Sequence, residues 1–306
     1  MPSKGGMSSA PNKPLVGVAW MVTSGLFFVG VTGVVRYIGT ELPAAQSAFL
    51  RYLLGLVFLI PMIRPILRAQ LTLPDLKLFT LRGAAHTLAV TGWFFAMARL
   101  PIAEVTAMNY MSPVYVTLGA ALFLGETLAL RRILAVLAAL VGAMIILRPG
   151  VREVSTGHIA MLFATLGFGV SYLTAKVMSN RVSASVVVGM LSITVTIGLT
   201  PFAIAVWVPP TLEQLFWIFV VACLATAGHY TMTLGLAAAP VTVTQPVTFL
   251  QLIWAVSLGT LIFGEPIDGW VILGGCVIIG SISYLTWREH RMRRRVVAPV
   301  PGATKV

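Results

Sequence analysis

Long uncharged stretches alternate along the chain with short segments that carry its charges, prolines and glycines. The first such stretch runs from Pro14 to Val35 and has 22 residues, enough to cross a hydrocarbon core of about 30 Å as a helix. The breaks between stretches predict ten transmembrane helices and therefore an all-α membrane protein. The predicted helices cover residues 15–36, 43–63, 76–98, 101–124, 130–148, 156–179, 184–207, 213–238, 241–263 and 268–287.

Composition also favours a membrane protein. Of 306 residues, 58% are hydrophobic and 10% are charged, too few polar side chains for a soluble surface. The first apolar run is longer than that of a cleavable signal peptide, and no small-residue cleavage site follows it, so we expect it to remain as a helix. Cys223 and Cys276 fall inside predicted helices and are expected to be buried thiols, not a disulfide or a metal site.

A Gly-Glu dipeptide occurs twice, as Gly125-Glu126 and Gly264-Glu265, each between a fourth and a fifth predicted helix. The two copies lie 139 residues apart (264 − 125), and two arginines follow the first while an aspartate follows the second. A repeat of five helices crosses the membrane an odd number of times, so the second copy is inverted relative to the first. Two inverted five-helix repeats are a recurrent architecture of secondary transporters.

Two roles remain open for these Gly-Glu junctions. A glycine ends a helix well, and a glutamate at the start of the next helix is favoured by the helix dipole, which would make both junctions structural. A gating role for the glutamates is the alternative. The structural role is the simpler explanation.

The positive-inside rule places both termini in the cytoplasm. In that orientation the cytoplasmic segments hold sixteen basic residues, namely Lys4, Lys13, Arg64, Arg68, Lys77, Arg82, Arg131, Arg132, Lys176, Arg181, Arg288, Arg291, Arg293, Arg294, Arg295 and Lys305. The outer segments hold four, namely Arg36, Arg99, Arg148 and Arg152. Topology and anionic lipid explain the net charge of +12, so we expect no nucleic-acid partner.

This orientation divides the chain into four parts. Residues 1–14 form a cytoplasmic N-terminal segment and residues 288–306 a basic cytoplasmic tail. Residues 15–150 form the first five-helix repeat, and residues 151–287 form the second, inverted repeat. We expect a multi-pass protein of the inner (plasma) membrane, present as a monomer or a weak dimer.

Two histidines fall inside predicted spans, His86 in the third helix and His229 in the eighth. An ionisable side chain within a membrane is a candidate functional group by default. The alternative for each is a neutral histidine that is hydrogen-bonded to a neighbouring helix. Trp93 lies seven residues after His86 and shares its helix face, where it either lines a cavity or packs.

The fourth and ninth helices carry polar residues at equivalent positions. The repeat offset pairs Asn109 with Thr248 and Ser112 with Gln251, and Thr244 extends the second set along the same helix face. These polar stripes predict two walls of one substrate cavity. The alternative is hydrogen bonding between helices, which is worth only about 0.6 kcal/mol per contact.

Two aromatic residues lie beside these stripes, Tyr110 and Trp254. Each is a candidate for stacking on an apolar substrate or, alternatively, for packing. Lys176 is expected to extend toward the cytoplasmic face, and Arg51, well inside the second helix, has no evident acidic partner in the sequence.

All nine acidic residues fall at predicted helix ends or in loops. We therefore expect no buried carboxylate to carry protons, and transport down the substrate's own gradient. The sequence contains no Walker A loop, HExxH or GxSxG motif, so neither ATP-driven pumping nor hydrolysis is expected. No metal or other cofactor is expected.

The two helix hairpins "FFAMARLPIAEVTAMNYMSPVYVTLGAALFLGETL" and "LGLAAAPVTVTQPVTFLQLIWAVSLGTLIFGEPI" resemble those of the drug/metabolite transporter superfamily in its EamA-type branch. The resemblance covers residues 15–287 and extends to YddG-like aromatic amino acid exporters. Two positions depart from the internal symmetry, since Leu252 stands opposite Pro113 and Met190 opposite Arg51. The resemblance implies the export of amino acids and related small metabolites.

We therefore expect a secondary transporter that exports amino acids, aromatic or otherwise hydrophobic ones above all, by alternating access. Its partners are the small-molecule substrate and membrane lipid. A multidrug or cationic amphiphile exporter is the alternative, and it favours an acid in the cavity. An intramembrane enzyme that uses His86 and His229 lacks a nucleophile or a metal set.

Overall fold

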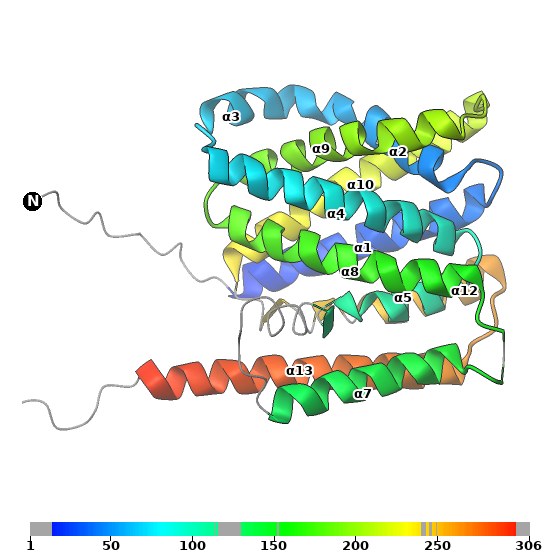
Figure 1. Ribbon diagram of the computed structural model, residues 1–306, viewed down its shortest axis with the longest axis vertical. Coiled ribbons are helices and arrows are strands. Elements are labelled where there is room, and N and C mark those ends of the chain that lie inside the picture. The colour runs from blue at the N-terminus through cyan, green and yellow to red at the C-terminus, as the bar shows by residue number, and fades with distance from the viewer. Residues whose placement is uncertain are drawn as a thin grey trace, which may run out of the picture.

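The computed structural model describes residues 14–112, 114–115, 130–151, 153–239, 243–244, 247–248 and 250–297. The regular elements in this part of the chain are helices, which run roughly parallel and antiparallel to one another (Figure 1). The first repeat contains α1 (Pro14–Ile38), α2 (Ala44–Gly55), η1 (Leu56–Met62), α3 (Ile63–Arg68), α4 (Leu73–Met97), α5 (Ile102–Asn109) and α7 (Leu130–Leu147). The second contains α8 (Thr156–Ser179), α9 (Ala184–Ala205), α10 (Leu212–Ala238), α12 (Leu250–Phe263) and α13 (Gly269–Val297).

Five helical segments of the described chain are long and apolar enough to cross a membrane. They are residues 14–38, 44–68, 156–179, 184–205 and 212–238. Large apolar side chains point outward from the bundle, such as Leu88, Phe163 and Leu261, which are 67%, 71% and 79% exposed. An apolar exterior is expected where lipid is the solvent, and the predicted all-α membrane fold of two repeats is confirmed.

The second predicted span is not one regular helix. After Gly55 the chain forms the 3₁₀ helix η1, which contains Pro61, and then α3 continues to Arg68. A proline inside a helix removes one backbone donor and collides with the preceding turn, which explains the change of helix type. The prediction of a helix over 43–63 therefore ended too early and missed the break.

Other helix ends also differ from the prediction. Thr72 caps α4 and pairs reciprocally with Asp75, so this helix begins at Leu73 instead of residue 76. α13 continues to Val297, ten residues beyond the predicted end at residue 287 (297 − 287). Cys223 and Cys276 are free thiols, as expected, but Cys276 is exposed and Cys223 only partly buried.

The helices pack in pairs that follow the internal repeat. α1 packs against α10 and α4 against α8. Because the offset makes α8 the equivalent of α1 and α10 the equivalent of α4, these two contacts are related by the pseudo-twofold symmetry. α2 likewise packs on its equivalent α9, and α7 on its equivalent α13. All four contacts join one repeat to the other, so the main helix packing of the bundle is shared between the repeats.

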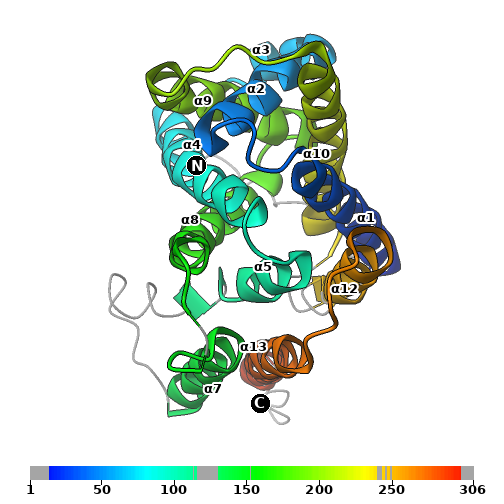
Figure 2. The same ribbon diagram turned by 90° about the vertical axis from the view of Figure 1, so that its right-hand side faces the viewer.

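The view along the helices shows how these pairs are arranged (Figure 2). α7 and α13 lie together at one end of the molecule, while α2, α3 and α9 lie at the other end. α7 and α13 approach closely because glycines meet there: a Cβ added to Gly142 would lie 2.7 Å from the carbonyl oxygen of Gly274. Only glycine permits such backbone contact.

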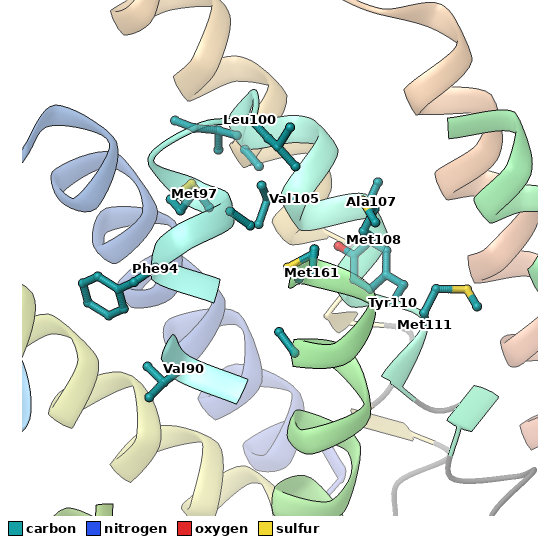
Figure 3. Close-up of a cluster of buried hydrophobic side chains, with 14 of the residues drawn as sticks. Val90, Phe94, Met97, Leu100, Val105, Ala107, Met108, Tyr110, Met111 and Met161 are labelled. Atoms are coloured by element: carbon teal, nitrogen blue, oxygen red, sulfur yellow. The ribbon is translucent and has the colours of Figure 1, made fainter. Parts of the chain in front are cut away.

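The core between these ends is apolar. Phe94 and Met97 of α4 pack with Val105 and Met108 of α5 and with Met161 of α8, as Figure 3 shows. All five side chains are less than 5% exposed. This core fills the space where α4 turns into α5, and it lies on the α5 side of the polar cluster described next.

Candidate transport site

The two intramembrane histidines come together in the bundle interior. The ring centroids of His86 on α4 and His229 on α10 lie 5.4 Å apart, with the rings edge to face. Aromatic side chains surround them. The ring centroid of Phe28 lies 5.1 Å from that of His229, and the centroids of Phe168 and Tyr52 lie 5.3 Å and 6.1 Å from that of His86. Groups from both repeats therefore meet at one point.

A buried arginine joins this group on one side. Arg82 lies one turn before His86 on α4, and its Nη1 donates to the carbonyl oxygen of Val187 on α9 at 2.9 Å. Its Nε donates to the hydroxyl of Ser171 on α8 at 3.3 Å. The Nδ1 of His86 lies 2.9 Å from the same hydroxyl. Ser171 thus links the guanidinium to the imidazole.

A second buried arginine lies on the other side. Arg51 of α2 stacks over the ring of the adjacent Tyr52, with its Cζ 3.8 Å from the ring centroid. The side chains of Arg51 and Arg82 are charged at physiological pH because guanidinium does not lose its proton there. We call Arg51, Tyr52, Arg82, His86, Ser171 and His229 the arginine–histidine cluster.

Within the described part of the chain, no carboxylate pairs with either arginine of the cluster. The Nη1 of Arg51 and the Nη2 of Arg82 are buried and have no hydrogen-bond partner there. Arg51 is 6% exposed and Arg82 is 1% exposed. Among the described residues, the cluster's two positive charges inside the bundle are therefore uncompensated.

A small cavity lies beside Arg51. Tyr52, His229, Ser192 and Thr226 also line it, with apolar groups from α2 and α9. It measures about 10 Å³, roughly the space of one water molecule. A metabolite can enter only if the surrounding helices move apart.

The predicted polar stripes of the fourth and ninth helices lie outside this cluster. The hydroxyl of Tyr110, at the end of α5, donates to the backbone oxygen of Thr248 at 3.1 Å. The hydroxyl of Ser112 donates to the backbone oxygen of Asn109 at 3.0 Å, and the amide oxygen of Asn109 is buried and unpartnered. Tyr110, beside the first stripe, thus reaches the backbone of the second, and both hydrogen bonds end on backbone oxygens.

The remaining candidates lie in separate surroundings. Gln251, at the start of α12, is half-buried. Thr244, in the segment before α12, is fully buried. Trp254 lies against Gly25 of α1, where an added Cβ would come within 3.0 Å of its ring. Trp93 packs against Phe94, with ring centroids 5.4 Å apart. Neither tryptophan is among the rings that contact the histidines of the arginine–histidine cluster.

The second Gly-Glu junction ties three elements together. Gly264 has a φ of +63°, which suits glycine and ends α12. The carboxylate of Glu265 accepts a hydrogen bond from the backbone nitrogen of Ile102 at 2.9 Å and lies 3.1 Å from the Nε of Arg36. It therefore caps α5. We had expected it to stabilise the start of the helix that follows it, so this expectation was wrong. The first junction, Gly125-Glu126, lies outside the described residues.

The expectation that no carboxylate is buried is wrong. Glu104, in the first turn of α5, is 2% exposed, and its Oε1 lies 2.6 Å from the Nε2 of His158 on α8. The backbone nitrogen of Ser155 donates to the Nδ1 of His158 at 3.0 Å. Glu104 does stand at a helix end, as predicted, but α8 covers it. The argument for transport without proton coupling therefore loses its premise.

Of the basic residues, Arg82 differs from its predicted position, whereas Lys176 lies at the helix end where it was expected. Arg82 was assigned to a cytoplasmic segment, yet its side chain turns into the bundle more than two turns after the start of α4. Lys176 directs its ammonium group to the backbone oxygens of Leu236 and Ala239 at the end of α10. The i, i+4 spacing of Arg82 and His86 within one apolar helix was the available signal for a shared site.

Comparison with known proteins supports a transport function. The model of the EamA-like transporter family matches residues 15–148 and 155–287, one match for each repeat. A riboflavin transporter of Vibrio cholerae is 27% identical, and the alignment covers 94% of this chain and 98% of that protein. An S-adenosylmethionine uptake transporter of Rickettsia bellii is 21% identical, with coverage of 93% and 98%.

Two further similarities extend this result. The pseudopaline exporter CntI of Pseudomonas aeruginosa is 23% identical over 86% of this chain and 93% of its own. A solved crystal structure shares the fold with a TM-score of 0.56 and 16% identity, covering 90% of this chain and 98% of that chain. The two family matches, the apolar helices and the paired repeats lead to one conclusion: the chain belongs to the EamA-like transporter family and is a multi-pass membrane transporter of small molecules, not an enzyme.

Proposed function

We propose that this transporter carries small aromatic metabolites, aromatic amino acids foremost, out across the inner membrane. The observation that carries the proposal is the meeting of Phe28, Tyr52, Phe168 and the two histidine rings in the bundle interior. Rings in this edge-to-face arrangement offer surfaces against which another flat ring packs favourably.

The wider family is compatible with such a substrate. Riboflavin, named for one of the relatives, contains a flat aromatic ring system. The cluster also argues against the alternative of a cationic amphiphile exporter. Its two buried guanidinium groups repel a cation, and no acid of the described chain pairs with them to offset that charge.

Alternating access is the mechanism that the geometry favours. The cavity is too small for a metabolite, so binding requires the helices around it to separate. Inverted repeats, which are related by a pseudo-twofold axis, give a carrier two equivalent ways to do this, one open to each side. Since the main helix contacts run between repeats, rocking one repeat against the other exposes the cluster.

We propose that both termini lie in the cytoplasm. α1 begins and α13 ends on the same side of the bundle, where the basic α3 also ends (Figure 1). A cysteine placed at position 268 should then react with an impermeant reagent from outside, and one at position 131 should not. The reverse labelling pattern rejects this orientation.

The transport proposal is tested with purified protein in proteoliposomes. Labelled phenylalanine, tryptophan and riboflavin are offered, and uptake or exchange of at least one is expected. His86→Ala, Asn109→Ala and Gln251→Ala should each reduce the rate several-fold while the yield of folded protein is unchanged. Ser257→Ala, at an exposed hydroxyl of α12 that bonds only its own helix, is the control. Transport of none of the three compounds refutes the proposal.

A further inference from the structure

The two arginines of the cluster present donors that the described chain does not use. Arg51 keeps its Nη1 and Arg82 its Nη2 buried without a partner. Both side chains are more than nine-tenths buried. Arg51 lines the small cavity, and Arg82 reaches the same group of rings through Ser171 and His86.

A buried charge without a counter-charge is strongly unfavourable, so buried charges in proteins are normally paired. The neighbours of these guanidinium groups do not neutralise them. Tyr52 offers its ring face, Ser171 a hydroxyl and Val187 a backbone oxygen. Such dipoles satisfy individual N–H groups but carry no negative charge.

The arrangement is specific to the first repeat. The repeat offset places Met190 opposite Arg51 and Val221 opposite Arg82. The scaffold is therefore symmetric while its charge is not. Packing of the repeats does not require two cations at these positions, because the equivalent positions of the second repeat are filled by apolar side chains.

We propose that Arg51 and Arg82 together bind the anionic group, a carboxylate or a phosphate, of the transported molecule. Guanidinium is the side chain best suited to such oxyanions because its planar N–H groups match their geometry. The hydroxyl of Thr226 on the cavity wall adds a neutral donor, whereas that of Ser192 donates to the backbone oxygen of Val188. The adjoining rings hold the flat part of the same molecule. This inference rests on the proposed function for the place of binding, and it defines the substrates as organic anions or zwitterions.

Binding is measured separately from transport, as the shift of the thermal unfolding midpoint of the purified protein. Two matched probe pairs are titrated, each differing in the anionic group alone. Riboflavin 5′-phosphate is compared with riboflavin, and L-phenylalanine with L-phenylalaninamide. In at least one pair, we expect the anionic member to raise the unfolding midpoint at a concentration at least about tenfold lower than its partner needs. This difference is equivalent to about 1.4 kcal/mol of binding free energy.

Variants assign the preference to the arginines. Arg51→Gln should remove it, and Arg51→Lys, which keeps the charge, should retain part of it. Arg99→Gln is the matched control, because Arg99 also stacks on an aromatic ring, 3.7 Å from the centroid of Phe95, but is exposed. Size-exclusion profiles and the midpoint without ligand show whether each variant is folded.

The outcomes separate the two proposals. Preference in the first pair alone identifies phosphate, and preference in the second pair alone identifies carboxylate. Equal binding within both pairs, or no binding of any of the four probes, overturns the anion site. So does a preference that folded Arg51→Gln retains in full. In each case labelled uptake in proteoliposomes still decides the transport function independently.

Discussion

Arginines near the helix ends and arginines in the bundle interior have different surroundings. Arg36, at the end of α1, faces the carboxylate of Glu265, which in turn caps α5. Arg51 and Arg82 lie in the interior, and no acid of the described chain faces them. The first kind of arginine has its counter-charge within the fold. The second kind has two unsatisfied donors and a cavity.

This difference predicts that the paired arginine serves mainly the stability of the fold and that the two interior arginines serve mainly substrate binding. Where the chain supplies both charges, removing one should weaken the fold and leave the substrate's environment intact. Where the described residues supply only the cation, removing it relieves the fold of a charge that they do not compensate. The predicted loss then falls on substrate binding.

Replacing both interior arginines, as Arg51→Gln with Arg82→Gln, should abolish transport, with a loss well above about tenfold. The physical reason is the loss of both anion-binding groups. Initial uptake rates in proteoliposomes measure it, and Arg36→Gln should keep most of the rate despite a lower unfolding midpoint. A double variant that transports at the wild-type rate contradicts the functional half of the comparison.

Replacing the buried acid, as Glu104→Ala, should destabilise the protein by about 1–3 kcal/mol, because the Nε2 of His158 loses its partner away from water. Unfolding in detergent with rising denaturant concentration measures this loss. Glu153→Ala, at an exposed acid nearby in the sequence, is the control and should leave the midpoint nearly unchanged. Equal midpoints for the two variants would show that the Glu104–His158 contact contributes nothing.

Replacing the junction glutamate, as Glu265→Ala, should cost about 1 kcal/mol, the usual effect of a lost helix cap. The bond to the nitrogen of Ile102 and the ion pair with Arg36 disappear together. Arg36→Gln removes only the partly exposed ion pair and should cost less. If Arg36→Gln is the more damaging variant in the same unfolding assay, the ion pair and not the cap holds this junction.

Replacing Asp75 should change stability only slightly. Its carboxylate pairs with Thr72 and with the exposed Arg181. Hydrogen bonds from Thr72, and then the Arg181 guanidinium, hold the pKa of Asp75 below its usual 3.8. A lowered folded-state pKa contributes stability above the unfolded value, which is lost as the pH falls through the folded value. Unfolding midpoints of wild type and Asp75→Asn should therefore differ slightly at pH 7 and converge below pH 3.8. A difference that does not change with pH contradicts this.

The spacing of charges, prolines and glycines along the chain was enough to predict the helices and the repeat. Peptide groups in lipid must pair within their own segment, so uncharged stretches of this length can only be helices. Local signals such as Thr211 with Gln214 and the proline in the second span set or disturb their ends. The Gly-Glu pair and the 139-residue offset were sufficient to predict two inverted copies.

The site could be predicted only in part. His86 and His229 were visible as ionisable residues inside predicted spans, and their depth alone made them candidates. Arg82 was assigned to a cytoplasmic segment because a linear sequence shows how near a residue stands to a helix end, but not which way its side chain turns. Ser171 gave no signal of its own, since a serine inside a helix most often bonds to its own backbone.

Which of these groups meet depends on how the helices pack, and no single segment shows it. Glu104 stands at a helix end, as its position in the chain indicates, yet it is buried because α8 from the other repeat covers it. Arg51 and Arg82 come from two different helices, and packing against α8, α9 and α10 brings both to the same group of rings. A residue's own helix fixes its depth in the membrane, whereas its neighbours depend on how the two repeats interlock. The charge balance of the interior is therefore a property of the fold and not of any single segment.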